Sequence, residues 1–133
     1  MVWYTKKQNK YNAKKTEFEG ITYDSKKEAG KAAELSLMVK SKAIKSWERQ
    51  IRFQFWLVKK RKDWMLTDKS PVGKENISLG SYYLDYKIQH NDGRIELLEI
   101  KSFITKTAVW RLKWKLLRAL YEGNENYVLT VEE

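Results

Sequence analysis

The pattern of apolar and polar residues predicts two helices in this chain. The first is expected over about residues 24–39, because Ser25 and Glu28 fit a capping box and the apolar residues after them have helical spacing. The second is expected over residues 106–121, before Gly123, a residue type that often ends helices. Its predicted core stripe is Val109, Leu112, Leu116, Leu117 and Leu120.

Alternation with a period of two predicts the strands. Ile51, Phe53 and Phe55 alternate with polar residues in the segment 44–58 and mark one strand face as core. A short strand or turn is expected around Gly20. The remaining predicted strands span residues 64–66, which would pair back onto the strand before them, 77–89, 95–101 and 127–131. Without the two short segments around Gly20 and at 64–66, the order is α-β-β-β-α-β, which predicts an α/β fold.

Composition indicates a small basic protein. The chain has 133 residues, which suits one domain, and a formal net charge of +10, so a polyanionic partner is expected. Six Trp and eight Tyr lie among 27 Lys and Arg, a combination that suits stacking on nucleic-acid bases. We expect a basic flexible arm over residues 1–16 and one folded domain over residues 17–133.

The same composition excludes several kinds of site. Because the chain has no cysteine, it has no disulfide, no thiolate zinc site and no cysteine nucleophile. His90 is the single histidine and lies beside a turn, which leaves little room for histidine-based catalysis. No apolar run reaches the roughly 20 residues of a membrane span, so no membrane partner is expected.

Acidic residues interrupt two of the predicted strands. Asp85 lies in one apolar run, and Glu99 lies in the next, two positions before Lys101. Side chains at i and i+2 share one face of a strand, and a buried charge is costly unless it is paired or binds a metal. The alternative is structural: an exposed ion pair of Glu99 with Lys101 and a solvated Asp85.

The turn between these strands decides whether the two acids meet. If the loop comprises residues 91–93, Asp85 lies directly opposite Glu99, with Cβ atoms about 4.5–5.5 Å apart. If the loop comprises only residues 92–93, Asp85 faces Ile100, on the other side of the sheet from Glu99.

If the carboxylates meet, Mg²⁺ is the best compensating charge, because it prefers carboxylate oxygens. The expected metal ligands are Asp85, Glu99, the carbonyl of Ile100 and Glu28, which the helical spacing directs inward. Lys101 can orient the attacking water or stabilise the developing negative charge. The candidate catalytic residues are Asp85, Glu99, Lys101 and Glu28, and the expected chemistry is metal-assisted phosphodiester cleavage. For Glu28, a purely capping role is the alternative.

Asp85 followed by Glu99-Ile100-Lys101, in this element order, resembles the PD-(D/E)XK nuclease superfamily over roughly residues 24–131. The segment 20–29 is similar to small phage and prophage endonucleases of the Holliday-junction-resolvase-like branch, which also use the position of Glu28. Leu84 stands where the superfamily name has proline. The resemblance implies a restriction-endonuclease-like core, with a mixed four-stranded sheet flanked by helices, and Mg²⁺- or Mn²⁺-dependent DNA hydrolysis.

Basic residues outside this site are candidates for binding DNA phosphates, with a solvated helix face as the alternative. They are Lys106, Arg111, Lys113, Lys115 and Arg118 near or on the second helix, and Lys59, Lys60, Arg61 and Lys62 in a basic connection. Trp110 and Trp114 lie on the same helix, where a core or dimer contact is favoured over a stacking wedge.

The expected function is that of an endonuclease selective for branched DNA. Two symmetric cuts in a junction require two sites, so a homodimer is expected. A duplex nickase or restriction-like endonuclease is the second hypothesis, and a non-catalytic basic DNA-binding module is the third. The expected location is the cytoplasm, or the host cytoplasm for a phage-encoded protein.

Overall fold

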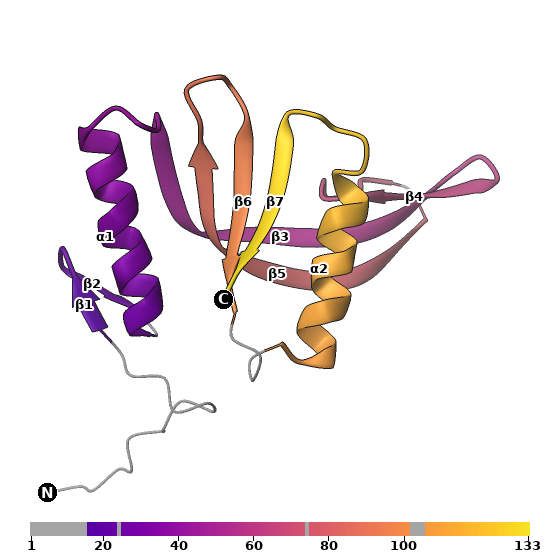
Figure 1. Cartoon of the computed structure of the whole chain (residues 1–133). Coiled ribbons are helices and arrows are strands. Elements are labelled where there is room, and N and C mark those ends of the chain that lie inside the picture. The colour runs from indigo at the N-terminus through magenta and orange to yellow at the C-terminus, as the bar shows by residue number, and fades with distance from the viewer. Residues whose placement is uncertain (1–15, 24, 74, 102–105) are drawn as a thin grey trace, which may run out of the picture.

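A computed structural model describes residues 16–23, 25–73, 75–101 and 106–133 (Figure 1). Apart from Thr16, the expected basic arm lies outside the described residues. In chain order the elements are β1 (Thr16–Phe18), β2 (Ile21–Tyr23), α1 (Lys26–Lys40), β3 (Ser46–Lys60), β4 (Asp63–Thr67), β5 (Asn76–Gln89), β6 (Ile95–Ile100), α2 (Ala108–Leu120) and β7 (Tyr127–Glu132).

The centre of the fold is a five-stranded mixed sheet in the order β4-β3-β5-β6-β7. Among the described residues, β6 and β7 are the only parallel neighbours, and α2 lies between them in the chain, so the expected α/β class with a mixed sheet is confirmed. The sheet has five strands rather than the expected four, because β4 pairs with β3 along its whole length and becomes an outer strand. β1 and β2 form a separate hairpin, in which Glu19 and Gly20 both have positive φ, as a type I′ turn requires.

The two helices cover different apolar clusters of the sheet. Neighbouring residues of β6 show this division, because Leu98 is buried in the cluster beneath α1, whereas Leu97 is buried in the cluster beneath α2. The first helix begins as expected, with the Ser25 hydroxyl accepting a hydrogen bond from the backbone N–H of Glu28 at 3.1 Å. Neither helix of the described residues combines the length and apolar character that a bilayer crossing requires.

The expected core stripe of α2 is confirmed for Leu117, which is buried, and for Leu116 and Leu120, which pack against the same cluster, but it is wrong for Val109 and Leu112. Val109 and Leu112 are 63% and 60% exposed, whereas Trp114 and Leu117 are buried. Trp110 also packs against the core beneath α2, one turn before Trp114. Burying two large indoles removes more apolar surface from water than burying a valine and a leucine, so the tryptophans determine which face meets the sheet.

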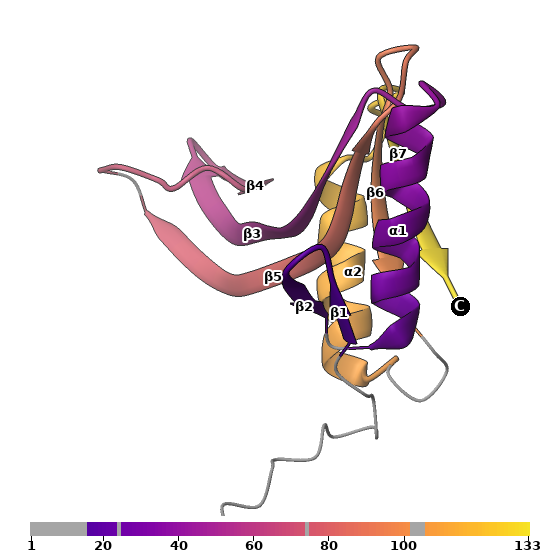
Figure 2. The same ribbon diagram turned by 90° about the vertical axis from the view of Figure 1, so that its left-hand side faces the viewer.

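Strands β3 and β5 extend beyond both helices as a curved arm that carries β4 (Figures 1 and 2). A register shift next to Phe55, opposite Gly80 with φ of 94°, adds a bulge to this arm. A second irregularity lies at Gln50 of β3, which has φ of 54°. The residues on either side of Gln50 pair with the residues on either side of Asp85, so the two positions face each other across the strands. The backbone of β3 is therefore distorted beside one of the two candidate acids.

The conformation of Gln50 predicts a specific pattern of stability. A β-branched residue is poorly compatible with positive φ, so Gln50→Val should lower the free energy of unfolding by about 1–2 kcal/mol, whereas Gln50→Gly should change it little. Urea unfolding measures both, and Gln54→Val, at a position of β3 without positive φ, is the matched control. Equal losses for Gln50→Val and Gln54→Val would contradict the prediction.

Candidate metal centre

The turn between β5 and β6 brings Asp85 and Glu99 together. The paired residues run from Gln89 with Ile95 to Tyr86 with Leu98, which is the register of a three-residue loop. Gly93 in this loop has φ of 91°, a conformation that glycine adopts without steric cost. The alternative in which the loop comprises residues 91–93 is therefore confirmed.

Beyond Tyr86, carboxylates take the place of the regular backbone ladder. The backbone N–H of Asp85 donates to Glu99 Oε2 at 3.4 Å, and the backbone N–H of Ile100 donates to Asp85 Oδ2 at 2.8 Å. Both acids are buried, with Asp85 9% and Glu99 2% exposed. Each carboxylate is therefore held by a main-chain donor of the opposite strand.

Glu99 has two further polar neighbours. The Tyr82 hydroxyl donates to its Oε2 at 2.5 Å, and Lys101 Nζ lies 3.7 Å from its Oε1. Burial, and then the charge of Asp85, raise the pKa of Glu99 to about 8, although the Tyr82 hydrogen bond and Lys101 act in the opposite direction. Two carboxylates side by side thus favour either a shared proton or a bound cation.

The donor set fits a magnesium-type ion. In the part of the chain that the structure describes, no three acidic or histidine side chains gather as a metal-binding group. Mg²⁺ does not require three, because it keeps several waters and is commonly held by one or two carboxylates. Asp85 and Glu99 would hold the ion, with Ile100, which lies between Glu99 and Lys101, as the expected carbonyl ligand.

The structure does not gather Glu28 with these two acids into one group of metal ligands. Glu28 is half-buried in the first turn of α1, and its backbone carbonyl accepts a hydrogen bond from the Tyr86 hydroxyl at 2.6 Å. Glu28 thus lies against Tyr86 of β5, the residue that follows Asp85 in the sequence. Its role as a metal ligand stays a prediction.

The basic candidates occupy two separate surfaces. On α2, Arg111, Lys115 and Arg118 are exposed and Lys113 is half-buried. Lys106, just before α2, forms an ion pair with Glu133. The other group, Lys59, Lys60, Arg61 and Lys62, is exposed at the hairpin between β3 and β4, on the arm (Figure 1). One surface therefore lies on the outer face of α2, and the other lies on the arm.

Sequence reasoning missed Tyr82 and Trp110 as parts of the site. Tyr82 binds Glu99, and the indole N–H of Trp110 donates to the Tyr82 hydroxyl at 3.1 Å. The available signal was chemical, because a tryptophan packed in a core usually needs a partner for its N–H. Trp110 and Trp114 stack on each other within the core, as the core interpretation expected.

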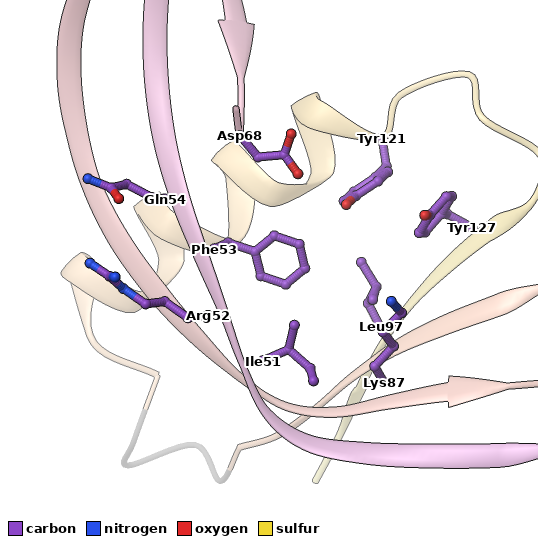
Figure 3. Close-up of a pocket in the computed structure, with 9 residues that line it drawn as sticks. All are labelled: Ile51, Arg52, Phe53, Gln54, Asp68, Lys87, Leu97, Tyr121 and Tyr127. Carbon is purple, nitrogen blue, oxygen red and sulfur yellow. The ribbon is translucent and has the colours of Figure 1, made fainter. Parts of the chain in front are cut away.

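A cavity of about 340 Å³ lies elsewhere, among β3, β5, β6 and the C-terminal end of α2 (Figure 3). It is lined by Ile51, Arg52, Phe53, Gln54, Asp68, Lys87, Leu97, Tyr121 and Tyr127. Tyr121 stacks on Tyr127 with ring centroids 4.2 Å apart. None of the candidate acids lines this cavity, so it is separate from the carboxylate pair.

Comparison with protein families gives a match over most of the chain. A family model described as a protein of unknown function, DUF1064, matches residues 8–130. The chain belongs to the DUF1064 family. No curated protein and no solved structure matches it. The family description assigns no activity, so a function for this DUF1064 protein must be argued from its own residues.

The raised pKa of Glu99 predicts how stability depends on pH when no divalent metal is present. Between the ordinary value of 4.5 and about 8, the folded protein keeps a proton that the unfolded chain releases. This stabilisation is complete below pH 4.5 and is lost as the pH rises through 8, by at most about 1.4 kcal/mol per pH unit. Glu99→Gln should remove this decline and be more stable than wild type at pH 8.

Urea unfolding in EDTA between pH 5 and 9 measures the effect. Glu48→Gln, which changes an exposed acid on β3, should follow the wild-type profile. Parallel profiles for Glu99→Gln and wild type would show that Glu99 is already ionised across this range.

Proposed function

We propose that this protein is a metal-dependent DNA endonuclease that hydrolyses phosphodiester bonds. The observation that carries the proposal is the buried pair Asp85 and Glu99, fixed by main-chain donors where the β5–β6 ladder ends, with Lys101 Nζ 3.7 Å from Glu99. We further propose that α1, β3, β5, β6, α2 and β7 form a PD-(D/E)XK core.

The cost of the carboxylate pair supports a metal rather than a purely structural role. Two adjacent acids in an apolar environment destabilise the fold unless a cation or a proton compensates them. Lys101 supplies one positive charge at 3.7 Å, which leaves the pair with a net negative charge when both acids are ionised. Bound Mg²⁺ or Mn²⁺ would polarise the scissile phosphate and acidify a water.

The residues of this chain then have distinct roles. Asp85 and Glu99 hold the cation, each with one oxygen fixed by a backbone N–H. The side chain of Lys101 is 24% exposed, so its ammonium can reach a phosphate oxygen or an attacking water at the edge of the site. Glu28, at the start of α1, is the candidate for a further ligand through water.

The distribution of charge supports DNA as the substrate. A net charge of +10 favours a polyanion, and the exposed Arg111, Lys115 and Arg118 form a basic face on α2. The basic hairpin tip, residues 59–62, offers a second phosphate contact on the arm. The resemblance of residues 20–29 to Holliday-junction-resolvase-like phage endonucleases supports branched DNA, a homodimer and action in the host cytoplasm.

Cleavage assays test the activity. Wild type should cut a labelled four-way junction with Mg²⁺ or Mn²⁺ and not with EDTA, whereas Asp85→Asn, Glu99→Gln and Lys101→Ala should be slower by roughly 100- to 1000-fold. Glu48→Gln should retain wild-type activity, because Glu48 is an exposed acid outside the pair. Flap, linear duplex and single-stranded DNA complete the substrate series.

The outcomes separate the candidate functions. If wild type binds DNA but cuts no substrate with either metal, the protein is a DNA-binding module and the endonuclease proposal fails. If it cuts plain duplex as fast as junctions, the nickase or restriction-like alternative holds, and the preference for branched DNA fails.

The basic face of α2 predicts salt-dependent binding. The double variant Lys115→Ala, Arg118→Ala should bind DNA more weakly and lower the slope of log affinity against log salt by roughly 0.9 for each lost phosphate contact. The matched control, Lys40→Ala with Lys45→Ala, removes the same charge from exposed positions near the end of α1. Equal losses in both variants would assign the effect to net charge alone.

A further inference from the structure

Tyr82 links the carboxylate pair to α2. It lies on β5, three residues before Asp85, and is buried in the cluster beneath α2. Its hydroxyl donates to Glu99 Oε2 at 2.5 Å and accepts from the Trp110 indole N–H at 3.1 Å. A hydrogen-bonded chain therefore runs from α2 through β5 to β6.

The direction of this chain is fixed by its chemistry. An indole N–H can only donate, and a tyrosine hydroxyl has a single proton to donate. Because Trp110 donates to the Tyr82 oxygen, the Tyr82 proton is directed to Glu99. Oε2 of Glu99 is thereby fixed, and Oε1 is the oxygen that faces Lys101.

Trp110 also contacts the other member of the Glu99–Lys101 pair. Lys101 Nζ lies 5.8 Å from the centroid of its ring, within the range of a cation–π interaction. The indole itself is held by stacking on Trp114, and the backbone N–H of Trp110 donates to the Thr107 hydroxyl at the start of α2. One well-fixed side chain thus supports both Glu99 and Lys101.

We propose that Tyr82 and Trp110 are positioning residues, which orient Glu99 for the cation and Lys101 for the substrate. The inference rests on the proposed function. Groups that hydrogen-bond a metal-binding carboxylate set its orientation, and their removal commonly lowers metal affinity by 10- to 100-fold. The competing explanation is that Tyr82 only satisfies buried polar atoms, in which case its hydroxyl affects stability and leaves metal affinity unchanged.

Calorimetric titration of the metal-free protein with Mn²⁺ tests this inference without relying on activity. Tyr82→Phe should weaken Mn²⁺ binding by roughly 10- to 100-fold, and Trp110→Phe should weaken it by a smaller factor. The double variant should bind no more weakly than Tyr82→Phe alone, because both changes break the same chain. Tyr83→Phe and Trp64→Phe, at exposed aromatic residues, should bind like wild type.

Urea unfolding in EDTA identifies any variant that fails to fold, and the conservative Phe replacements keep the buried rings. Wild-type affinity in folded Tyr82→Phe would overturn the inference and leave the proposed function standing. If the two losses of Mn²⁺ affinity multiply in the double variant, Tyr82 and Trp110 act independently, and the proposal of one hydrogen-bonded chain fails. If wild type itself binds no Mn²⁺ and cuts no DNA, the proposed function fails, and the inference fails with it.

Discussion

The burial of two carboxylates side by side is the constraint on which the rest of this structure depends. Asp85 and Glu99 repel each other, and neither can regain the water it loses on folding. The surrounding atoms compensate in a specific way, because backbone N–H groups, a tyrosine hydroxyl and an ammonium all direct positive charge toward the pair. Two apolar residues at these positions would give a higher free energy of unfolding, so the chain keeps a destabilising pair in its sheet.

The fold places this cost next to both apolar clusters. Leu97 and Leu98 alternate between the two sides of β6, so the strand is anchored on both faces immediately before Glu99. The positive φ of Gln50 lies beside Asp85 on β3, which adds backbone strain at the same level of the sheet. Strain and buried charge are therefore concentrated together, where two layers of apolar packing can compensate for them.

Local signals in the sequence were sufficient for much of this arrangement. The start of α1 followed from Ser25, and the turn before β6 narrowed the register of β5 and β6 to two alternatives, of which the structure has the three-residue loop. The exposure of Val109 and Leu112 could not be predicted from apolar spacing, because both fit the same helical stripe as Leu117. The contact of Tyr82 with Glu99 depends on two strands and a helix meeting in space, which no local pattern encodes.

The two sides of α2 connect the proposed DNA-binding face with the proposed metal site. Arg111 faces solvent, while the preceding residue, Trp110, is in contact with Tyr82 and Lys101. The outer face of α2 carries the basic residues, and its inner face supports Glu99 through Trp110 and Tyr82. A shift of α2 caused by binding at its outer face would therefore also move the indole that hydrogen-bonds Tyr82.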